Sequence, residues 1–423
     1  MLAHQLPLFK VKKSRFHISS FCGLPLLHHV AHWLGIPEQA DRLLALKERR
    51  RGYSVSQLLM SLVMLLTAGG ERLDDIRMLR HDPVIRALSD LKTIPDATTL
   101  GRFLRRFRGP QLAALAQLST GLACRIQQHC SPHQATLDVD SSLILTDKQD
   151  AQITYVGQRG YNPMFAFLAE TKTVLLAQFQ PGNTSPGANA VQFLTRCLKA
   201  LPKTTTHVCL RSDSAWYQAQ VTDYCQQHNI LFSITADKDH SVKELIASLP
   251  EHAWQPFEDQ EISEVVHSMG RSQYAFRLIL LRRLKDQQDL FDSYVYGAII
   301  TNRQDDPATV VQWHRHRADC ENLIKENKHG FALAHLPSGS LDANAAFSYT
   351  VALAFNIVQA MKLLLLPPGW RSLTIKNLRF RLLHLGGILV RHARELIIKL
   401  PQDYPYSHLY ESLACRVRGP CPI

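Results

Sequence analysis

The sequence of 423 residues lacks several features that would assign its class at once. Its nine cysteines include no C-x-x-C pair, which argues against a zinc ribbon or a disulfide framework and favours a reducing cytosol. The first residues, MLAHQLPLFKVKK, lack the apolar segment of a signal peptide. Because 46% of the residues are hydrophobic, the chain is not a disordered one, and its length predicts two to three domains.

A membrane-spanning run is also missing. The most apolar stretch, AAFSYTVALAFNIVQAM at 345–361, has 17 uncharged residues, but Asn356 and Gln359 interrupt it and Lys362 follows it. A spanning helix needs about 20 predominantly apolar residues. We therefore expect a buried helix here, and no membrane partner.

Acidic residues are scarce at both ends of the chain, whose net charge is +12. Residues 1–130 carry 19 Lys and Arg against nine Asp and Glu, and residues 361–400 carry eight against one. Residues 131–360 carry 19 against 24. Basic segments suit phosphate contacts and an acidic middle suits bound metal cations. Chance clustering of solvated charge is the plainer alternative.

The hydrophobic periodicity changes near residue 134. Residues 21–130 are predicted to be helical, and in PDATTLGRFLRRF at 95–107 the apolar residues share one side of a helix. The other sides of this amphipathic helix carry Arg102, Arg105 and Arg106. They could lie along DNA phosphates, or the segment could be an ordinary surface helix. From 134 onward, three strands, a helix, a strand, a helix and a strand predict a mixed sheet flanked by helices.

The second half of this predicted sheet is less regular. YVYGAIITN at 294–302 is typical of a buried strand, and AFRLILLRRL at 275–284 is a candidate strand within a more polar segment. Asp306-Pro307 has the N-cap and N1 residues of a helix that we expect to run to about residue 330.

Acidic residues fall at three places that such a sheet offers for chemistry. Asp138 and Asp140 point to the same face of a strand, where two carboxylates need compensation such as a bound cation. Asp213 follows the buried strand VCLR, at the carboxyl end where α/β proteins place ligand sites, although Asp also favours turns and caps there. Glu321 lies on the helix that Pro307 opens.

Charged residues share one stripe of the helix around Glu321. His314, Arg317, Glu321 and Lys328 are 3, 4 and 7 residues apart, which places all four in a narrow sector of a helix. Glu321 could bind a metal there while two cations hold phosphates. The commoner alternative is an exposed helix with i, i+4 ion pairs.

This stripe resembles the signature Y-x2-R-x3-E-x6-K of DDE transposases from bacterial insertion sequences. Every spacing is kept, but His314 stands where that family has Tyr. Further similarities are DSS at 140–142, RSDSAW around Asp213, and YVGQRGYNP at 155–163, which contains Arg159. The resemblance extends from about residue 50 to 360.

The resemblance implies an α/β fold with an RNase H-like mixed-sheet catalytic core. It implies Asp140, Asp213 and Glu321 as catalytic ligands of two Mg²⁺ ions, with Mn²⁺ as a substitute, and Asp138 remains an alternative to Asp140. DNA contacts are expected from Arg317, Lys328, His314, Arg159 and the three arginines of 95–107. Each ligand of such a site is a carboxylate, which is what Mg²⁺ prefers.

The resemblance also implies a domain order. We expect a helical, basic, DNA-binding region at 1–130, the first part of the core at 131–239, and a strand-rich insertion at 240–291. The second part of the core, with the Glu321 helix, follows at 292–335, and a helical basic region at 336–423. Trp254 in the insertion could stack on an unpaired base, although packing is at least as common a role.

The expected function is a transposase that cuts double-stranded DNA at terminal inverted repeats and joins the 3′-OH ends to target DNA. A homodimer in the DNA complex and a cytoplasmic, nucleoid-associated location are expected with it. Two other functions remain open: a metal-dependent nuclease without strand transfer, and a catalytically silent DNA-binding protein.

Overall fold

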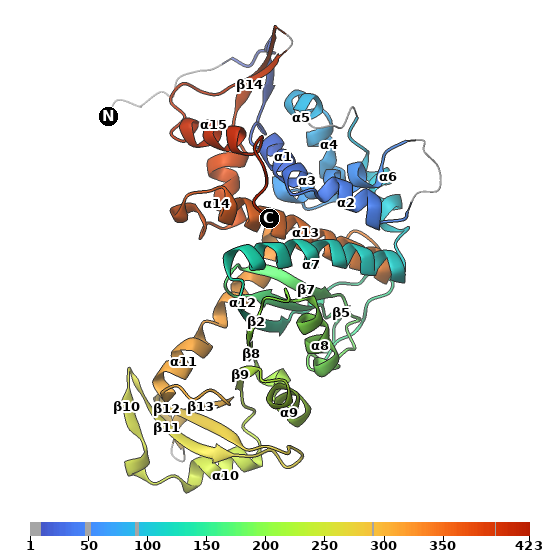
Figure 1. Cartoon of the computed structure of the whole chain (residues 1–423). Helices are drawn as coiled ribbons and strands as arrows, with labels where there is room; N and C mark the ends of the chain where they lie inside the picture. Colours follow the sequence, from blue (N-terminus) through green and yellow to red (C-terminus); the bar gives the residue numbers. More distant parts are fainter. Residues whose placement is uncertain (1–9, 47–51, 89–92, 290–291, 394) are drawn as a thin grey trace, which may run out of the picture.

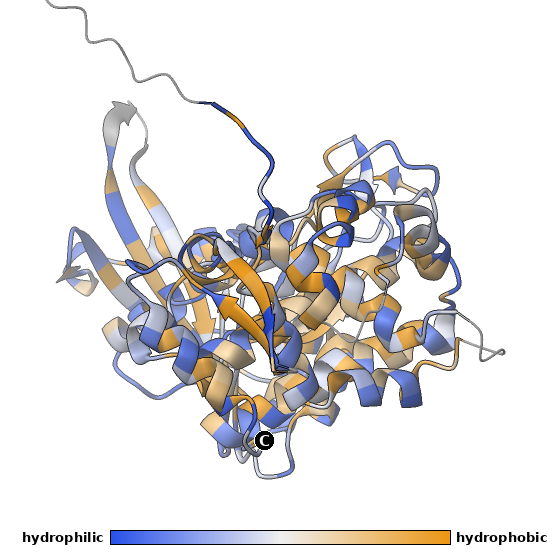
Figure 2. Cartoon of the chain, turned by 90° about the horizontal axis from the view of Figure 1, so that it is seen from above, coloured by the Kyte–Doolittle hydropathy of each residue, from blue (hydrophilic) through white to orange (hydrophobic). Residues whose placement is uncertain are grey.

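The computed structural model describes residues 10–423 apart from 47–51, 89–92, 290–291 and 394. Figure 1 shows the N- and C-terminal segments together at one end, a large sheet below two long helices in the middle, and an extension of that sheet at the other end. In Figure 2, hydrophobic residues gather on inner strands and helices, and hydrophilic residues lie mainly on outward faces.

The large sheet joins strands between residues 134 and 301. Among the described residues it has nine strands, in the order β10-β11-β12-β13-β9-β8-β2-β6-β7. The five that come first along the chain are β2 (Gln134–Ser141), β6 (Met164–Leu168), β7 (Thr173–Gln178), β8 (His207–Ser212) and β9 (Leu231–Thr235). β8 is parallel to β2 and β9, whereas the other pairs among these five are antiparallel. The predicted mixed sheet is confirmed.

Alternation along β2 divides its side chains between two cores. Leu137 and Val139 pack in a core with the helices α8 (Ala190–Ala200) and α9 (Ala219–Gln227). Asp138 and Asp140 therefore project from the opposite face. On that face Phe165, the cross-strand neighbour of Asp140, belongs to a second and larger core.

The segment after β9 extends the same sheet. It comprises α10 (His240–Ser248), β10 (Gln255–Phe257), β11 (Gln260–His267), β12 (Phe276–Asp289) and β13 (Asp292–Thr301). The strands form an antiparallel meander whose last member pairs with β9. The strands predicted at 275–284 and 294–302 are thus the two arms of one hairpin. Trp254 is buried in this extension, with the guanidinium carbon of Arg282 4.5 Å from its ring centre, so it has the packing role.

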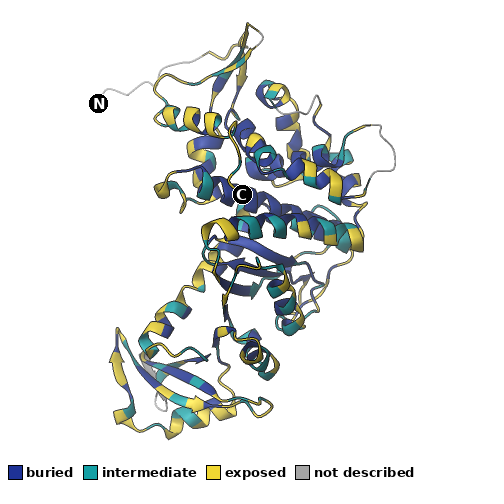
Figure 3. Ribbon diagram, in the orientation of Figure 1, coloured by how far each residue is buried: buried dark blue, intermediate teal, exposed yellow. Residues whose placement is uncertain are grey.

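Two long helices cover the face of the sheet opposite α8 and α9. α7 (Gly109–Cys130) and α13 (Leu341–Leu364) pack on each other and on β7 (Figure 1). Among the described residues, α13 is the one helix long and apolar enough to cross a membrane, but 83% of its most apolar window is buried inside the protein (Figure 3). Its Asn356 exchanges hydrogen bonds of 2.8 and 2.9 Å with the backbone of Val174. The helix is therefore the buried one that the sequence predicts.

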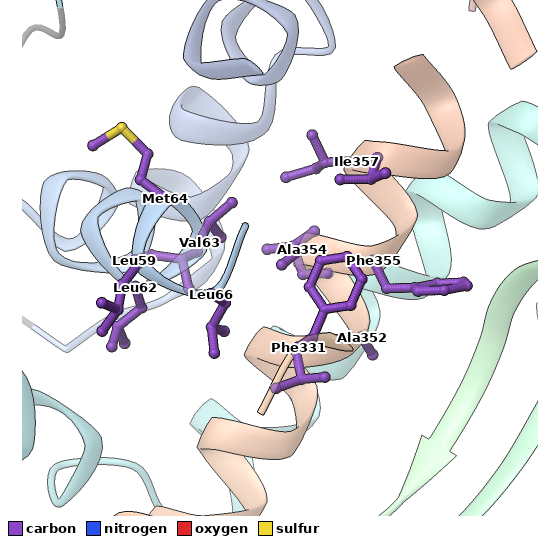
Figure 4. Packing of buried hydrophobic residues seen from close by; sticks show 14 of the residues in the cluster. Leu59, Leu62, Val63, Met64, Leu66, Phe331, Ala352, Ala354, Phe355 and Ile357 are labelled. Atoms are coloured by element: carbon purple, nitrogen blue, oxygen red, sulfur yellow. The ribbon is translucent and has the colours of Figure 1, made fainter. Parts of the chain in front are cut away.

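The N-terminal helices pack against α13 in the larger core. They are α1 (Leu24–Trp33), α2 (Ile36–Leu43), α3 (Val55–Ala68), α4 (Ile76–Arg80), α5 (Pro83–Leu88) and α6 (Ala97–Leu104). Figure 4 shows the contact of α3 with α13, with Val63 and Leu66 on one side and Ala354 and Ile357 on the other. A capping box formed by Ser54 and Gln57 fixes the start of α3.

The C-terminal region, which is expected from the sequence to be helical, contains strands as well as helices. It contains α14 (Ile375–Leu378), a π-helical turn (Arg379–Leu383), β14 (Gly387–His392), β15 (Glu395–Lys399) and α15 (Ser407–Arg416). Within the described chain, β14 and β15 form a three-stranded sheet with β1 (His17–Ser19), so the two ends of the protein meet. The alternating apolar residues of this segment explain the strands, because a period of two favours β structure.

The helix expected over 307–330 is interrupted. α11 (Pro307–Arg315) ends before α12 (Ala318–Lys325), and a π-helical turn (Glu326–Gly330) follows directly. Asp306 caps α11 by accepting the amide of Ala308 at 3.0 Å, as its Asp-Pro start predicts. The break between α11 and α12 removes the single continuous stripe on which the four charged residues were expected to lie.

Candidate active site

Two acidic positions meet where parallel strands end. Asp140 lies near the end of β2, and Asp213 directly follows β8. The parallel register of these neighbouring strands brings both acids to the same edge of the sheet. Asp140 accepts the amide of Ser141 at 2.7 Å, and Asp213 accepts the amide of Ala215 at 3.2 Å. The local backbone therefore helps to fix the direction of each carboxylate.

Arg317 joins this edge to the third acid, Glu321. Its Nη1 lies 3.5 Å from Oδ2 of Asp140, and its Nη2 donates to Oε1 of Glu321 at 2.9 Å. α12 is held against β2 by Cys320, whose Sγ lies 3.7 Å from the carbonyl oxygen of Asp138. The side chain of Asp140 is 14% exposed and that of Glu321 is 47% exposed. One guanidinium thus bridges a buried acid and one that is open to solvent.

Burial and mutual repulsion perturb the strand acids. Burial raises the pKa of Asp140 to about 7, the carboxylates of Asp213 and Glu321 add to the rise, and Arg317 opposes it. Burial also raises the pKa of Asp213, again against the effect of Arg317. Acids that repel one another in a partly desolvated place are stabilised by a cation bound among them.

Asp138 has a different partner, Arg211. The Asp138 side chain is 2% exposed, and its two oxygens accept Nε and Nη2 of Arg211 at 2.6 and 2.8 Å. The two residues are direct partners in the β2–β8 register, and the carbonyl of Trp313 accepts a further hydrogen bond from Arg211 at 2.8 Å. The charge of Asp138 is therefore neutralised inside the protein. This geometry favours Asp140 over Asp138 as the acid of the site.

Sequence reasoning missed Arg211. The available signal was an arginine in the short buried strand VCLR, because a buried cation requires an acidic partner. Pairing it with one of the two acids of LDVD would have separated a structural carboxylate from a functional one.

His314 lies inside the protein. Its Nδ1 is 2.7 Å from Oγ of Ser233, and its Nε2 is 3.0 Å from Oγ1 of Thr235. Burial lowers the pKa of His314 to about 4, with Arg317 and Arg211 adding to the effect, so the ring is neutral at pH 7. Both ring nitrogens are hydrogen-bonded to β9. The predicted phosphate contact would require at least one of these hydroxyl partners to be released.

Lys328 and Arg159 are bound to backbone carbonyls beside the site. Lys328 donates to Oγ of Ser142 at 3.2 Å and to the carbonyl of Leu143 at 2.9 Å, just after the strand that carries Asp140. Arg159 donates to the carbonyls of Ala151 and Gln149, both at 2.9 Å, and so organises the loop that precedes it. In this structure Lys328 lies next to the acids, whereas Arg159 supports a neighbouring loop.

The predicted basic helix has the expected amphipathic character. α6 buries its apolar side in the larger core, and the side chains of Arg102, Arg105 and Arg106 are exposed. Arg102 lies in the helix, and the other two follow its last residue. The structure does not bring these arginines into contact with the acids, and their contact with DNA stays a prediction.

The acids supply the right kind of ligand for a divalent cation. Asp140, Asp213 and Glu321 offer carboxylate oxygens, which hard cations such as Mg²⁺ prefer. Their shared environment also attracts positive charge, because Arg317 already contacts two of them. In the part of the chain that the structure describes, no three His, Cys, Asp or Glu side chains lie close enough together to hold a metal ion. The three acids thus have the ligand chemistry that a divalent cation requires, but in this structure they are not drawn together around one point, and Arg317 contacts both Asp140 and Glu321.

Comparisons with known proteins now decide the family. The model of the family described as transposase DDE domain, group 1, matches residues 9–419. The chain belongs to this family. A search of curated proteins finds no match. A search of solved structures finds similarity to the piggyBac transposase in a cryo-EM structure of its synaptic complex with hairpin DNA, with a TM-score of 0.42 and 11% sequence identity over 96% of this chain and 85% of that one.

Membership of the DDE transposase family confirms the resemblance found in the sequence at the level of the family. It supports transposase function for this chain, and DDE transposase domains generally use divalent metal ions.

Proposed function

We propose that this protein is a transposase of the bacterial insertion-sequence type with the Tyr-Arg-Glu-Lys signature, in which His314 replaces the Tyr. It cuts double-stranded DNA at terminal inverted repeats and joins the 3′-OH ends to target DNA. The proposal assigns Asp140, Asp213 and Glu321 as the catalytic acids. The observation that supports it is that Arg317 contacts Asp140 and Glu321 and acts electrostatically on Asp213, in a chain of the DDE transposase family.

The strand order supports an RNase H-like core. Three antiparallel strands, β7, β6 and β2, are followed across the sheet by the parallel strands β8 and β9, with helices on both faces. Asp140 lies on the central strand of these five and Asp213 at the end of its parallel neighbour. α12 packs on β2 and presents Glu321 toward them. Asp140 and Asp213 lie at one edge of the sheet, and the contact of Arg317 with Asp140 and Glu321 links the helix acid to that edge, which supports the assignment.

Bound among these carboxylates, two Mg²⁺ ions, or Mn²⁺ in their place, would stabilise the attacking and leaving oxygens of an in-line phosphoryl transfer. Asp140, Asp213 and Glu321 would hold the ions in their ionised forms. Release of Arg317 from Glu321 would free its guanidinium for a DNA phosphate, which arginine binds well through two parallel hydrogen bonds. Lys328, beside the Asp140 strand, is placed to contact the same backbone.

The remaining parts of the proposal concern partners and location. The active form is a homodimer in the complex with transposon-end DNA, and the protein works in the cytoplasm on the nucleoid. Size measurement of the protein with and without an inverted-repeat duplex tests the first statement, because a monomeric complex would contradict it.

The test of the catalytic assignment uses Asp213→Asn and Glu321→Gln with a duplex that carries the ends of the element. We expect both variants to lose Mg²⁺-dependent strand cutting while they still bind the duplex. Glu411→Gln, on the exposed face of α15, is a matched control that should cut normally. Full cutting by either site variant would refute the assignment.

A second assay separates transposition from simple cleavage. Wild-type protein is given a pre-cut end with a free 3′-OH and a target plasmid. Joined product supports the transposase, whereas cutting without joining would leave a metal-dependent nuclease as the function. Binding without cutting in Mg²⁺ and in Mn²⁺ would leave a catalytically silent DNA-binding protein.

A further inference from the structure

A pocket of about 620 Å³ lies on the other side of α12 from the acids. It is bounded by α12, the C-terminal half of α13 and the segment around α14, all labelled in Figure 1. Its lining includes six cationic side chains: Lys172, Lys325, Lys362, Arg371, Lys376 and Arg379. Four of these come from the basic segment 361–400, whose excess of positive charge the acid site does not explain.

Lys362 is the central observation. It is the polar end of the apolar helix α13, and only 2% of the residue is exposed. Among the described residues, no hydrogen bond or ion pair is made by its ammonium group. Burial lowers its pKa, Lys172 adds to the effect, and the carboxylate of Glu326 opposes it. A buried lysine that opens into a pocket without a direct partner lacks a counterion at that point.

Neither acid of the pocket forms a direct ion pair with Lys362, and Glu326 acts on it only through the field of its charge. Glu326 accepts the backbone amide of Ile375 at 2.5 Å, and Asp319 pairs with Lys172 at 3.2 Å on the rim. Arg379 donates hydrogen bonds to carbonyls at the end of α3, so it contributes to the pocket only the electric field of its positive charge. The six cations against two carboxylates leave a net charge of about +4 in the pocket, which favours an anion.

We propose that this pocket binds a phosphate group of the DNA backbone. Lys362 would receive the phosphate oxygen at the base of the pocket, and the exposed Lys325, Arg371 and Lys376 would contact the same strand at its rim. The assignment to DNA rests on the proposed function. The pocket is separated from Glu321 by the width of one helix, about 10 Å, so one duplex can reach both.

The phosphate group itself could come from DNA or from a small phosphate compound, and the open rim favours the polymer. Four cations are exposed around the mouth, where a strand can pass. A site for a small compound would be expected to enclose it on most sides. The experiment below distinguishes the two sources.

The first measurement is the salt dependence of binding of the full chain to a duplex of arbitrary sequence, in EDTA so that cleavage plays no part. Loss of one phosphate contact lowers the slope of log K against log salt by about one. We expect Lys362→Met and Lys376→Met each to show this drop, with roughly three- to tenfold weaker binding at low salt. Lys203→Met, in an exposed loop beyond α8, removes the same charge and should bind as the wild type does.

The second measurement is the melting temperature in inorganic phosphate and in chloride at equal ionic strength. Phosphate should stabilise the wild type more than it stabilises Lys362→Met. The proposal would be overturned if the salt dependence of DNA binding were unchanged in both pocket variants and phosphate did not raise the melting temperature of the wild type. A phosphate effect with unchanged slopes would overturn the assignment to DNA in favour of a small phosphate compound. Lys376→Met lies on the surface, so its slope remains informative if the core variant folds poorly. Because no step depends on cutting, these outcomes are independent of the catalytic test.

Discussion

Asp138 and Asp140 are two residues apart on one strand face, yet the same substitution should change stability in opposite directions. Burial raises the pKa of both carboxyls, but both oxygens of Asp138 are hydrogen-bonded to the buried Arg211, which opposes the rise and needs this counterion. At Asp140 other carboxylates add to the rise. Asparagine has nearly the same shape as aspartate and carries no charge. Asp138→Asn should therefore destabilise the metal-free protein, and Asp140→Asn should stabilise it near pH 8.

The magnitudes follow from the two environments. Asp138→Asn leaves Arg211 as a buried cation without its counterion, which costs about 3–5 kcal/mol. The pKa of Asp140 is raised from 3.8 to about 7. At about 1.4 kcal/mol per pKa unit, the ionised carboxylate costs up to about 4 kcal/mol above pH 7. A carboxyl whose pKa is raised on folding costs stability progressively as the pH rises from its unfolded-state pKa to its folded-state pKa, and the cost is constant above that. The benefit of Asp140→Asn should therefore be full above pH 7, fade below pH 7 and vanish near pH 4.

The assay is the free energy of unfolding of both variants and the wild type in EDTA, at pH values between 4 and 8. Mg²⁺ provides a further comparison, because it should stabilise the wild type and Asp138→Asn more than Asp140→Asn. A destabilising effect of Asp140→Asn near pH 8 would refute our account of the electrostatics. A neutral effect of Asp138→Asn would show that the Arg211 pair is dispensable.

Two further predictions concern buried polar residues. The pKa of His314 is lowered from 6.5 to about 4 in the folded protein. As the pH falls, this histidine is therefore protonated in the unfolded chain before it is protonated in the folded one. Up to about 3 kcal/mol of stability should be lost as the pH falls from 6.5 toward 4. His314→Gln should flatten this decline in the unfolding free energy, and an unchanged pH profile would contradict the assignment. Asn356→Leu should destabilise the protein by roughly 2–4 kcal/mol, because the edge strand β7 loses hydrogen bonds to both backbone groups of Val174. Chemical denaturation measures this loss, and a stable Asn356→Leu protein would show that water replaces the amide.

Much of the central fold could be predicted from the sequence because its elements have strong local patterns. The period-two segments from 134 to 235 became strands, and the apolar stretch at 345–361 became the buried helix α13. The C-terminal strands were missed because their partner, β1, comes from the other end of the chain. The break between α11 and α12 was missed because residues 316 and 317 carry no proline or glycine that would mark it.

The candidate site was predictable in its residue types more than in its contacts. Spacing placed Asp140, Asp213 and Glu321 on suitable elements, and the structure puts Arg317 between two of them. The role of Asp138 depended on Arg211, which is 73 residues away in sequence, so no local pattern could assign it. His314 was expected on an accessible face, but the break before α12 leaves it buried against β9.

Arg317 links the electrostatics of the acids to metal and DNA binding, because it contacts both Asp140 and Glu321. A guanidinium between Asp140 and Glu321 offsets part of the repulsion among the acids, so the protein can fold before any cation arrives. A cation that binds both acids must displace at least the 2.9 Å contact with Glu321, and a DNA phosphate is a suitable new partner for the released guanidinium. Metal binding and DNA binding should therefore reinforce each other at this residue. The three-residue gap between Arg317 and Glu321 has a physical reason, because residues four apart lie one helical turn from each other, and from the N-cap of α12 Arg317 reaches both the glutamate and Asp140 near the end of β2.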